Sequence, residues 1–394
     1  MKLHTTFSAT LLIGCFTLMG SQSLVAQEPK LRTTLYGHKM GVIAGFFSPD
    51  GKMLVTKAGD TLLWDVATEK STKIGDGLAD PLFFSPDGNL LLLCRNKSRD
   101  FQIYDIAGRK NSVLTITPGE TNEAMSPDGW RQLVIKNNTL FLRDLATPYD
   151  VTTGGNTVEI PGAIVPGMSN MFTSVRGAPI HPMQFSADGK TLVVKDKDSN
   201  FMLWDVSSGK STKIPKSAGL YFALSPDSKT MVARCGTKAP GYSMKGLDDN
   251  IQIFKLATGK SIASLQSDKN QNGTVTTMVY SPDSKTIAAA SVYQVVLWNA
   301  TNGRNTAILR KPRNELSDSL REVHFTPDSK TLVATSGNAF EFWDIASRKI
   351  TGSVPIDGPT LLAFSPDGAM LATGGKDGRI RLWDMPGGKP ADKK

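Results

Sequence analysis

The chain has 394 residues, 40% of them apolar and 21% charged, which is the composition of an ordinary globular protein and excludes a disordered one. Its formal net charge is +9, but the lysines do not form basic runs with interleaved aromatic residues. This pattern argues against a nucleic-acid-binding surface, and we expect no nucleic-acid partner.

The first 26 residues have the pattern of a secretory signal peptide. Lys2 supplies a positive charge, an apolar run extends from Phe7 to Gly20, and Ala26 precedes a polar stretch. The run is too short to span a bilayer, so we expect an exported protein, periplasmic or extracellular, cleaved near Ala26. A second interpretation stays open: the residues up to Cys15 resemble a bacterial lipobox, which would make Cys15 a lipid anchor. No later segment is long and apolar enough for a transmembrane helix.

After this leader, one turn sequence recurs eight times. It has the form Ser-Pro-Asp-Gly, with Ser in place of Gly in the fifth, sixth and seventh copies. The copies begin at Ser48, Ser85, Ser126, Ser186, Ser225, Ser281, Thr326 and Ser365. A second mark, apolar-x-apolar-Trp-Asp, follows each turn. It ends at Asp65, Asp105, Asp144, Asp205, Lys255, Asn299, Asp344 and Asp384.

Each repeat has the pattern of a small antiparallel sheet. Proline at the second turn position favours a type I turn, and glycine at the fourth accepts the left-handed conformation. Apolar strands flank the turn, a third strand ends at the Trp-Asp mark, and a fourth follows. Because a four-stranded sheet cannot bury both of its faces alone, the eight units are expected to stack on one another.

Gly37-His38, FSPDG at residues 47–51 and LLWD at residues 62–65 resemble the WD40 repeat, as does the whole of residues 364–384. The resemblance extends over nearly all of residues 31–386. It implies an all-β fold, an eight-bladed WD40-type β-propeller with four antiparallel strands per blade. The implied domains are a signal peptide (1–26), one propeller (27–386) and a polar tail (387–394). Members of this family serve mainly as interaction platforms.

The resemblance also implies roles for the most regular positions. The family's hydrogen-bonded set of His, Thr, Asp and Trp is complete in the first blade alone. The residues assigned a structural role in the repeats are His38, Thr56, Asp60, Trp64, Trp204, Trp298, Trp343 and Trp383. Residues 31–36 alternate as a strand does, whereas the residues after Asp384 are polar. We therefore expect the N-terminal strand to complete the last blade, which closes the ring and removes an open sheet edge.

Three groups of residues could form functional sites, but a structural role fits each of them better. Glu322 and His324 are two residues apart on a strand and could form an acid/base pair, but isolated strand histidines are common. The stretch 196–200 begins like a calcium loop without the Gly and Glu that complete one. Cys94 and Cys235 fall on blades too far apart for a disulfide.

We expect no catalytic site, cofactor or metal. The alternative is a propeller enzyme, a hydrolase or lactonase with a central-channel site, which the apolar innermost strands disfavour.

Two connections are longer than their counterparts, one between Asp144 and Ser186 and the other between Ser225 and Lys255. Since neighbouring strands are antiparallel, both should emerge on one face, and long loops on a rigid scaffold often hold function. The expected partner is a protein or peptide, bound by a monomer through Ile164, Val165, Met168, Met171, Phe172, Arg176, Tyr242, Met244 and Lys245. The alternative is that these loops pack on each other or cap the channel. Lysine-bearing turns lie on the opposite face, which either binds anions or is simply of mixed charge.

Overall fold

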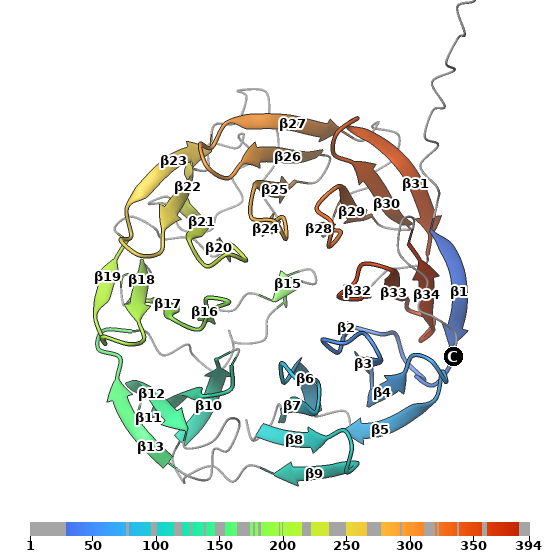
Figure 1. Ribbon diagram of the computed structural model, residues 1–394, viewed down its shortest axis with the longest axis horizontal. Helices are drawn as coiled ribbons and strands as arrows, with labels where there is room; N and C mark the ends of the chain where they lie inside the picture. Colours follow the sequence, from blue (N-terminus) through green and yellow to red (C-terminus); the bar gives the residue numbers. More distant parts are fainter. Residues whose placement is uncertain are drawn as a thin grey trace, which may run out of the picture.

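The computed structural model describes residues 29–385 with internal gaps. The gaps are residues 76–78, 96–100, 114–119, 127, 138, 146–153, 164–173, 176–177, 180–182, 197, 199, 215–221, 236–249, 266–276, 292–293, 311–319, 321–322, 337–338 and 357–360. The described strands form eight four-stranded antiparallel sheets that follow one another round a ring in chain order (Figure 1). The eight-bladed β-propeller predicted from the repeats is therefore confirmed.

The first four blades contain the following strands. Blade 1 consists of β2 (Ala44–Phe47), β3 (Met53–Lys57), β4 (Thr61–Asp65) and β5 (Ser71–Gly75). Blade 2 consists of β6 (Ala79–Phe84), β7 (Leu90–Arg95), β8 (Phe101–Asp105) and β9 (Lys110–Val113). Blade 3 consists of β10 (Glu120–Met125), β11 (Arg131–Lys136), β12 (Thr139–Leu145) and β13 (Gly154–Glu159). Blade 4 consists of β16 (Gln184–Phe185), β17 (Thr191–Lys195), β18 (Phe201–Asp205) and β19 (Ser211–Lys213).

The other four blades repeat this order. Blade 5 consists of β20 (Phe222–Leu224), β21 (Thr230–Cys235), β22 (Asn250–Lys255) and β23 (Ser261–Leu265). Blade 6 consists of β24 (Thr277–Tyr280), β25 (Thr286–Ala290), β26 (Gln294–Asn299) and β27 (Asn305–Arg310). Blade 7 consists of β28 (Val323–Phe325), β29 (Thr331–Thr335), β30 (Ala339–Asp344) and β31 (Lys349–Pro355). Blade 8 consists of β32 (Leu361–Phe364), β33 (Met370–Gly374), β34 (Ile380–Asp384) and, from the other end of the chain, β1 (Lys30–Leu35).

The recurrent turn joins the first and second strands of every blade, and its hydroxyl explains why it recurs. In blade 1, the Ser48 hydroxyl donates to the Asp50 carboxylate (2.6 Å) and accepts the backbone N–H of Met53 (2.9 Å). The same two bonds occur in each of the other seven blades, with Thr326 replacing the serine in blade 7. The hydroxyl thus satisfies backbone and carboxylate together, which fixes the turn.

The fourth position of this turn requires a positive φ, which glycine adopts without strain. Ser228, Ser284 and Ser329 occupy it at φ values of 58°, 61° and 61°. Each serine hydroxyl accepts a hydrogen bond from the backbone N–H of the turn aspartate in the preceding blade, at 3.0 to 3.1 Å. The serines that replace glycine therefore link the inner turns of blades 4 to 7 directly.

The Trp position of each repeat fills the interface with the preceding blade. Trp64, only 1% exposed, packs in one apolar cluster with Ile380 and Leu382 of blade 8. Equivalent clusters form at six other interfaces around Tyr104, Trp204, Phe254, Trp298, Trp343 and Trp383. Burial of a large apolar side chain stabilises by about 1.5–3 kcal/mol. The core of the protein is thus divided among the joints between blades.

The interface between blades 2 and 3 differs because Arg143 stands at the Trp position. Its guanidinium donates to the Glu120 carboxylate at 2.6 Å, and both side chains are largely buried. Lys136 also pairs with Glu120, at 3.4 Å. Among the described side chains, the fully buried part of the apolar cluster here is reduced to Leu92 and Leu145. A polar pair therefore replaces the aromatic ring at this joint.

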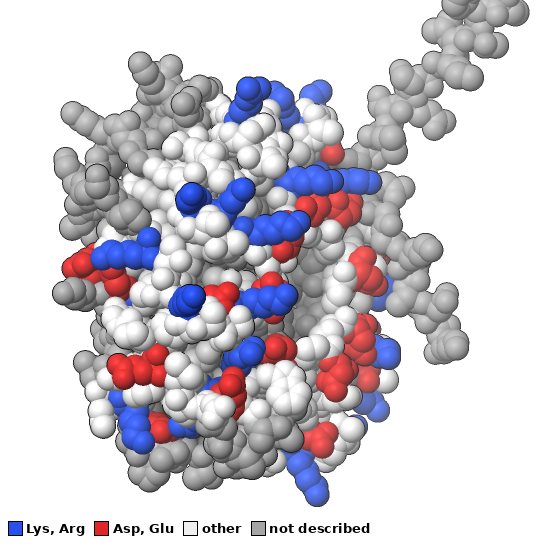
Figure 2. Space-filling view, turned by 60° about the vertical axis from the view of Figure 1, so that its left-hand side comes forward, with Lys and Arg blue, Asp and Glu red and all other residues white. Residues whose placement is uncertain are grey.

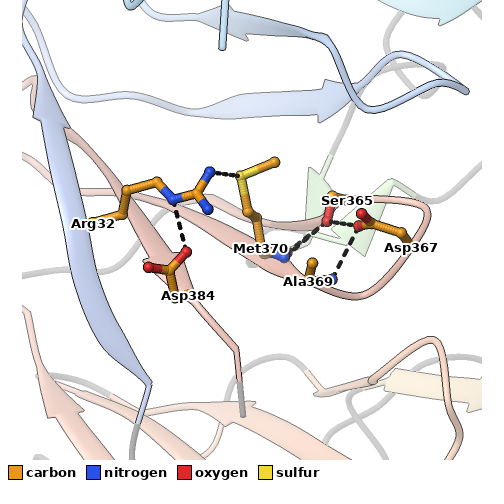
Figure 3. Close-up of polar contacts among 6 residues, drawn as sticks. All are labelled: Arg32, Ser365, Asp367, Ala369, Met370 and Asp384. Atoms are coloured by element: carbon orange, nitrogen blue, oxygen red, sulfur yellow. Dashed lines mark hydrogen bonds and ion pairs between the residues drawn. The ribbon is translucent and has the colours of Figure 1, made fainter. Parts of the chain in front are cut away.

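The ring closes as expected, because β1 pairs antiparallel with β34 and completes blade 8 (Figure 1). Arg32 fastens this strand: its Nε donates to Asp384 at 2.7 Å and its Nη1 contacts the Met370 sulfur at 3.1 Å (Figure 3). In blade 1, the equivalent Asp65 accepts the N–H of Thr68 in the turn to the fourth strand. The fourth strand of blade 8 comes instead from the N-terminal end of the chain, and Arg32 of that strand donates to the carboxylate that a turn N–H serves in blade 1.

Candidate functional site

The ring has two faces that the hydrogen bonds distinguish. In every blade, the residue after the Trp-Asp mark donates its N–H to a carbonyl of the first turn, as Val66 does to Lys52 and Met385 to Ala369, over 2.8 to 3.1 Å. The first turn and the end of the third strand therefore lie together, and we name this side the turn face. Connections between the second and third strands, and connections from one blade to the next, emerge on the opposite side, which we name the loop face.

The turn face carries lysines next to aspartates. Its exposed cations in the two sets of turns include Lys52, Lys70, Lys190, Lys210, Lys229, Lys260, Lys285, Arg304, Lys330 and Lys349. Lys52 and Lys229 each pair with the aspartate two residues earlier, both at 3.4 Å. Figure 2 shows blue and red side chains interspersed on the side of the molecule that it displays. The carboxylates offset much of the positive potential of the lysines on this face.

The turn carboxylates are held in their charged form. Partial burial raises the pKa of Asp227. Hydrogen bonds from Ser225 and from the backbone and side chain of Lys229 lower the pKa by more than burial raises it, so the net pKa lies below its usual value. The same opposing causes give a net lowering of the pKa at Asp50, Asp188, Asp283 and Asp367. These groups serve the turns in which they lie and are not poised for proton transfer near neutral pH.

The two longest connections both leave the ring on the loop face. Residues 160–183 connect β13 to β16, and residues 236–249 connect β21 to β22. The first connection contains a separate two-stranded sheet of β14 (Ser174–Val175) and β15 (Ala178–Pro179), and β15 is drawn inside the outline of the ring (Figure 1). Ala163, at the start of the same connection, forms a bridge with Asp196 of blade 4.

The nine predicted partner-binding residues lie outside the described residues. They are Ile164, Val165, Met168, Met171, Phe172, Arg176, Tyr242, Met244 and Lys245. The structure places the ends of both connections, on blade 3, blade 4 and blade 5, and these ends share one face. The contacts of the nine side chains stay a prediction.

His38, Thr56 and Trp64 form a hydrogen-bonded chain in blade 1. The Thr56 hydroxyl accepts the Trp64 Nε1–H at 2.8 Å and lies 2.8 Å from His38 Nε2. Burial lowers the pKa of His38, while the charge of Asp60 opposes this shift. Asp60 itself pairs with Lys73 at 2.9 Å. The chain of three side chains stabilises blade 1.

A second bond of the same kind occurs in blade 8, where the Trp383 Nε1–H donates to the Thr373 hydroxyl at 2.9 Å. Sequence reasoning missed it because no His accompanies this pair. The signal was present: a threonine follows the turn serine by eight residues in blades 1 and 8. Trp343 has Ala334 at this position, and its buried Nε1 has no hydrogen-bond partner among the described residues.

The other predicted candidates have structural surroundings. His324 is half-buried on β28, whereas Glu322 lies outside the described residues. The Asp196 carboxylate accepts the backbone N–H groups of Asp198 and Asn200 at 2.9 Å, and Lys213 pairs with it at 2.6 Å. This is the geometry of a closed turn. Within the described ranges, no three His, Cys, Asp or Glu side chains are grouped as metal ligands.

The cysteines have no described role in a site. Cys235 is a free thiol in the core of blade 5, where burial raises its pKa to about 11. The side chain of Cys94 lies outside the described residues. None of the described segments forms a helix with the length and apolar character that a bilayer span requires.

The ring of eight sheets, the repeated turn and the buried Trp position together define an eight-bladed β-propeller built from repeats of the Trp-Asp type. Residues 357–384, in blade 8, match the family model described as WD domain, G-beta repeat. The chain is therefore a propeller that carries a WD40 repeat.

Several curated proteins are similar to this chain. Protein tipD of Dictyostelium discoideum is 23% identical over 305 residues, which cover 75% of this chain and 45% of tipD. The small ribosomal subunit protein RACK1 of Drosophila melanogaster is 25% identical over 255 residues, 52% of this chain and 78% of RACK1. The guanine nucleotide-binding protein subunit beta of Oryza sativa subsp. indica is 24% identical over 223 residues, 52% of this chain and 55% of the subunit. The match thus spans less than half of tipD and about half of the β subunit.

Proposed function

We propose that this propeller is an exported scaffold that binds a protein or peptide on its loop face. The observation that carries the proposal is the position of the two longest connections, residues 160–183 and 236–249. Both emerge on one face and from consecutive blades, because the strands that they join are antiparallel members of blades 3, 4 and 5. Long loops held by a rigid scaffold are the usual place for a binding surface.

The similar proteins support an interaction role. The names of RACK1 and of the β subunit describe each as a component of a larger assembly, the small ribosomal subunit and a guanine nucleotide-binding protein. A propeller offers such assemblies a rigid, wide surface with long loops at its edge. We extend to this chain only the use of the propeller as a binding platform.

The innermost strands support a scaffold over an enzyme. Two carboxylates on these strands are engaged in ion pairs: Asp80 of blade 2 pairs with the buried Lys57 of blade 1 at 3.4 Å, and Glu120 pairs with Arg143 of its own blade, blade 3. Strands such as β2 and β32 are otherwise apolar. A catalytic channel needs acids or bases that are directed at a substrate, whereas these two carboxylates are engaged by cations of the fold, one across a blade interface and one within a blade.

Replacing residues 162–174 and 238–246 with short Gly/Ser turns should abolish partner capture while the melting temperature stays near that of the parent. Shortened surface loops cost little stability, whereas the binding surface is removed. The measurement is crosslinked capture from the native envelope fraction, combined with circular dichroism melting. The control is a variant with Lys229, Lys285 and Lys330 changed to Glu on the turn face, which should capture normally. Unchanged capture by the loop variant would show that the two long connections are not the binding site.

The exported part of the proposal has its own test. The protein isolated from its native cell should begin near Gln27, because the leader is removed at Ala26. N-terminal sequencing and mass spectrometry provide the measurement. An intact Met1 on cytoplasmic protein would contradict export, and a lipid-modified Cys15 would establish the lipoprotein alternative.

A further inference from the structure

The three most exposed large apolar side chains of the described residues belong to one short segment. Tyr36, Met40 and Ile43 are 68%, 63% and 62% exposed. They lie in the connection from β1 to β2, residues 36–43. This connection joins the fourth strand of blade 8 to the first strand of blade 1, so it lies on the loop face. Solvent-exposed apolar groups that cluster in this way commonly mark an interaction site.

The backbone of this segment is fixed between two blades. Val42 is fully buried, and its N–H donates to the Gly375 carbonyl of blade 8 at 3.2 Å. The N–H of Ile43 donates to the Lys57 carbonyl of blade 1 at 2.8 Å. On the blade 8 side, a Cβ at Gly378 would lie 2.8 Å from the His38 carbonyl oxygen, so the two backbones are in close contact. A surface held in place before binding loses little conformational entropy when a partner docks.

Cations surround these apolar side chains. Lys39, Lys376 and Arg379 are exposed, and the Arg379 guanidinium lies 5.5 Å from the centre of the Tyr36 ring. In the part of the chain that the structure describes, Lys39 and Lys376 form no ion pair. The Cα of Lys376 lies 3.1 Å from where a Cβ on Gly41 would be, so Lys376 flanks the segment directly.

Two carboxylates border the same surface, and each already has a cation of its own. Asp60 pairs with Lys73 at 2.9 Å, and Asp377 pairs with Arg381 at 2.7 Å. Arg379 also lies 3.9 Å from Asp377, so the charges that remain without a carboxylate partner among the described residues are those of Lys39 and Lys376. Exposed Tyr, Met and Arg side chains are also the types that are enriched in protein interfaces.

We propose that this surface, the 36–43 patch (Tyr36, Lys39, Met40, Ile43, Lys376 and Arg379), docks an acidic, extended segment of a partner protein. Apolar side chains of that segment contact Tyr36, Met40 and Ile43, and its carboxylates pair with Lys39 and Lys376. The inference rests on the proposed function, since it specifies the chemistry of a partner on the same face.

A flat anionic membrane fits this surface less well than an extended segment does. Asp60 and Asp377 are 46% and 39% exposed in their side chains. A planar surface that approached the three cations would also cover these carboxylates and separate them from water without offering them a new hydrogen-bond donor. An extended chain can place its acidic residues at Lys39 and Lys376 and pass the two aspartates.

The test is to select a random peptide library against the mature parent protein and to measure the enriched peptides by fluorescence polarisation. We expect peptides that combine carboxylates with apolar residues. The double variants M40S/I43S and K39E/K376E should each weaken their binding by about tenfold or more, and added salt should weaken it further. The matched control is V158S/I350S, which removes exposed apolar side chains from β13 and β31 and should bind as the parent does. Melting curves verify that each variant is folded.

Three results would overturn the inference: no enriched peptide, enriched peptides without carboxylates, or equal binding by the parent and both patch variants. Cosedimentation with phosphatidylglycerol vesicles that is lost in the patch variants, in the absence of peptide binding, would assign the patch to a membrane instead. The loop replacements described above leave the patch intact. Failure of the peptide selection therefore counts against the patch alone, and unchanged capture by the loop variant counts only against the role that the proposed function gives to the two long connections.

Discussion

A mature protein that lacks residues 30–35 should melt at a markedly lower temperature than the parent or aggregate. These residues form β1, which pairs along β34 and buries Leu35 in the cluster between blades 8 and 1. Without them, the backbone N–H and C=O groups on the outer edge of β34 lose their partners and become a template for pairing with another chain. Circular dichroism melting and size-exclusion chromatography measure both outcomes.

Arg32→Ala is the matched control for this deletion. It keeps the strand and removes only the bonds to Asp384 and Met370, with the ion pair partly open to solvent. Partly exposed ion pairs contribute about 1 kcal/mol or less, so we expect a small change in melting temperature. A deletion variant as stable as Arg32→Ala would show that β1 does not carry the closure of the ring.

Arg143→Ala should lower the free energy of unfolding by about 3 kcal/mol or more. The change removes the main partner of Glu120, whose side chain is only 3% exposed, and leaves a buried carboxylate with the half-exposed Lys136. Urea denaturation at neutral pH provides the measurement.

The same variant should alter the pH dependence of stability. Burial raises the pKa of Glu120, but Arg143 and Lys136 lower it more, so its pKa in the folded protein is below the usual value. A carboxyl group with a lowered folded pKa adds stability above its unfolded pKa of about 4.3 and loses it as the pH falls through the folded value. Loss of Arg143 should remove this contribution, and the stability of the variant should fall less steeply than that of the parent as the pH falls from about 4.3 towards the folded pKa of Glu120.

Replacement of both partners separates the loss of the pair from the loss of packing. The double variant Glu120→Leu with Arg143→Leu removes both charges and leaves an apolar interface, as at the other joints. We expect it to be more stable than Arg143→Ala, because no buried charge remains without its partner. If the free energy of unfolding of Arg143→Ala is within about 1 kcal/mol of that of the parent, the ion pair does not stabilise the interface between blades 2 and 3 appreciably.

The fold could be predicted from sequence because its signals are local and repeated. The Ser or Thr hydroxyl and the Asp carboxylate of each inner turn form hydrogen bonds within the turn itself, so every copy reports the same structure independently. The bonds between blades could not be predicted in this way. Ser228 accepts from Asp188, forty residues earlier, and the sequence shows only a serine in place of a glycine. The bond from Arg32 to Asp384 likewise joins residues from opposite ends of the chain, which meet because β1 pairs with β34.

The candidate site could be predicted only in part. The length of a loop shows which segment of the chain is unusual, but it does not show which residues the side chains of that loop contact. The spacing identified the two long connections, and the antiparallel strands placed them on one face. The 36–43 patch was not foreseen, since the resemblance gave Gly37-His38 a structural role and Tyr36 the end of a strand. Its exposed side chains follow from the way blades 8 and 1 meet, which involves residues at opposite ends of the chain.

The three serines of the inner turns divide the ring into two mechanically different arcs. From blade 4 to blade 7, directional N–H···O bonds tie each inner turn to the next, through Ser228, Ser284 and Ser329. At the joint of blades 8 and 1, glycine stands at this position, and a Cβ there would reach only van der Waals contact with the Pro366 ring. Such contacts resist sliding far less than an oriented hydrogen bond does. Thermal fluctuations in the width of the central opening should therefore be largest among the blades whose inner turns carry glycine. A partner that binds across blades 8 and 1 would restrict motion on this more flexible side of the ring.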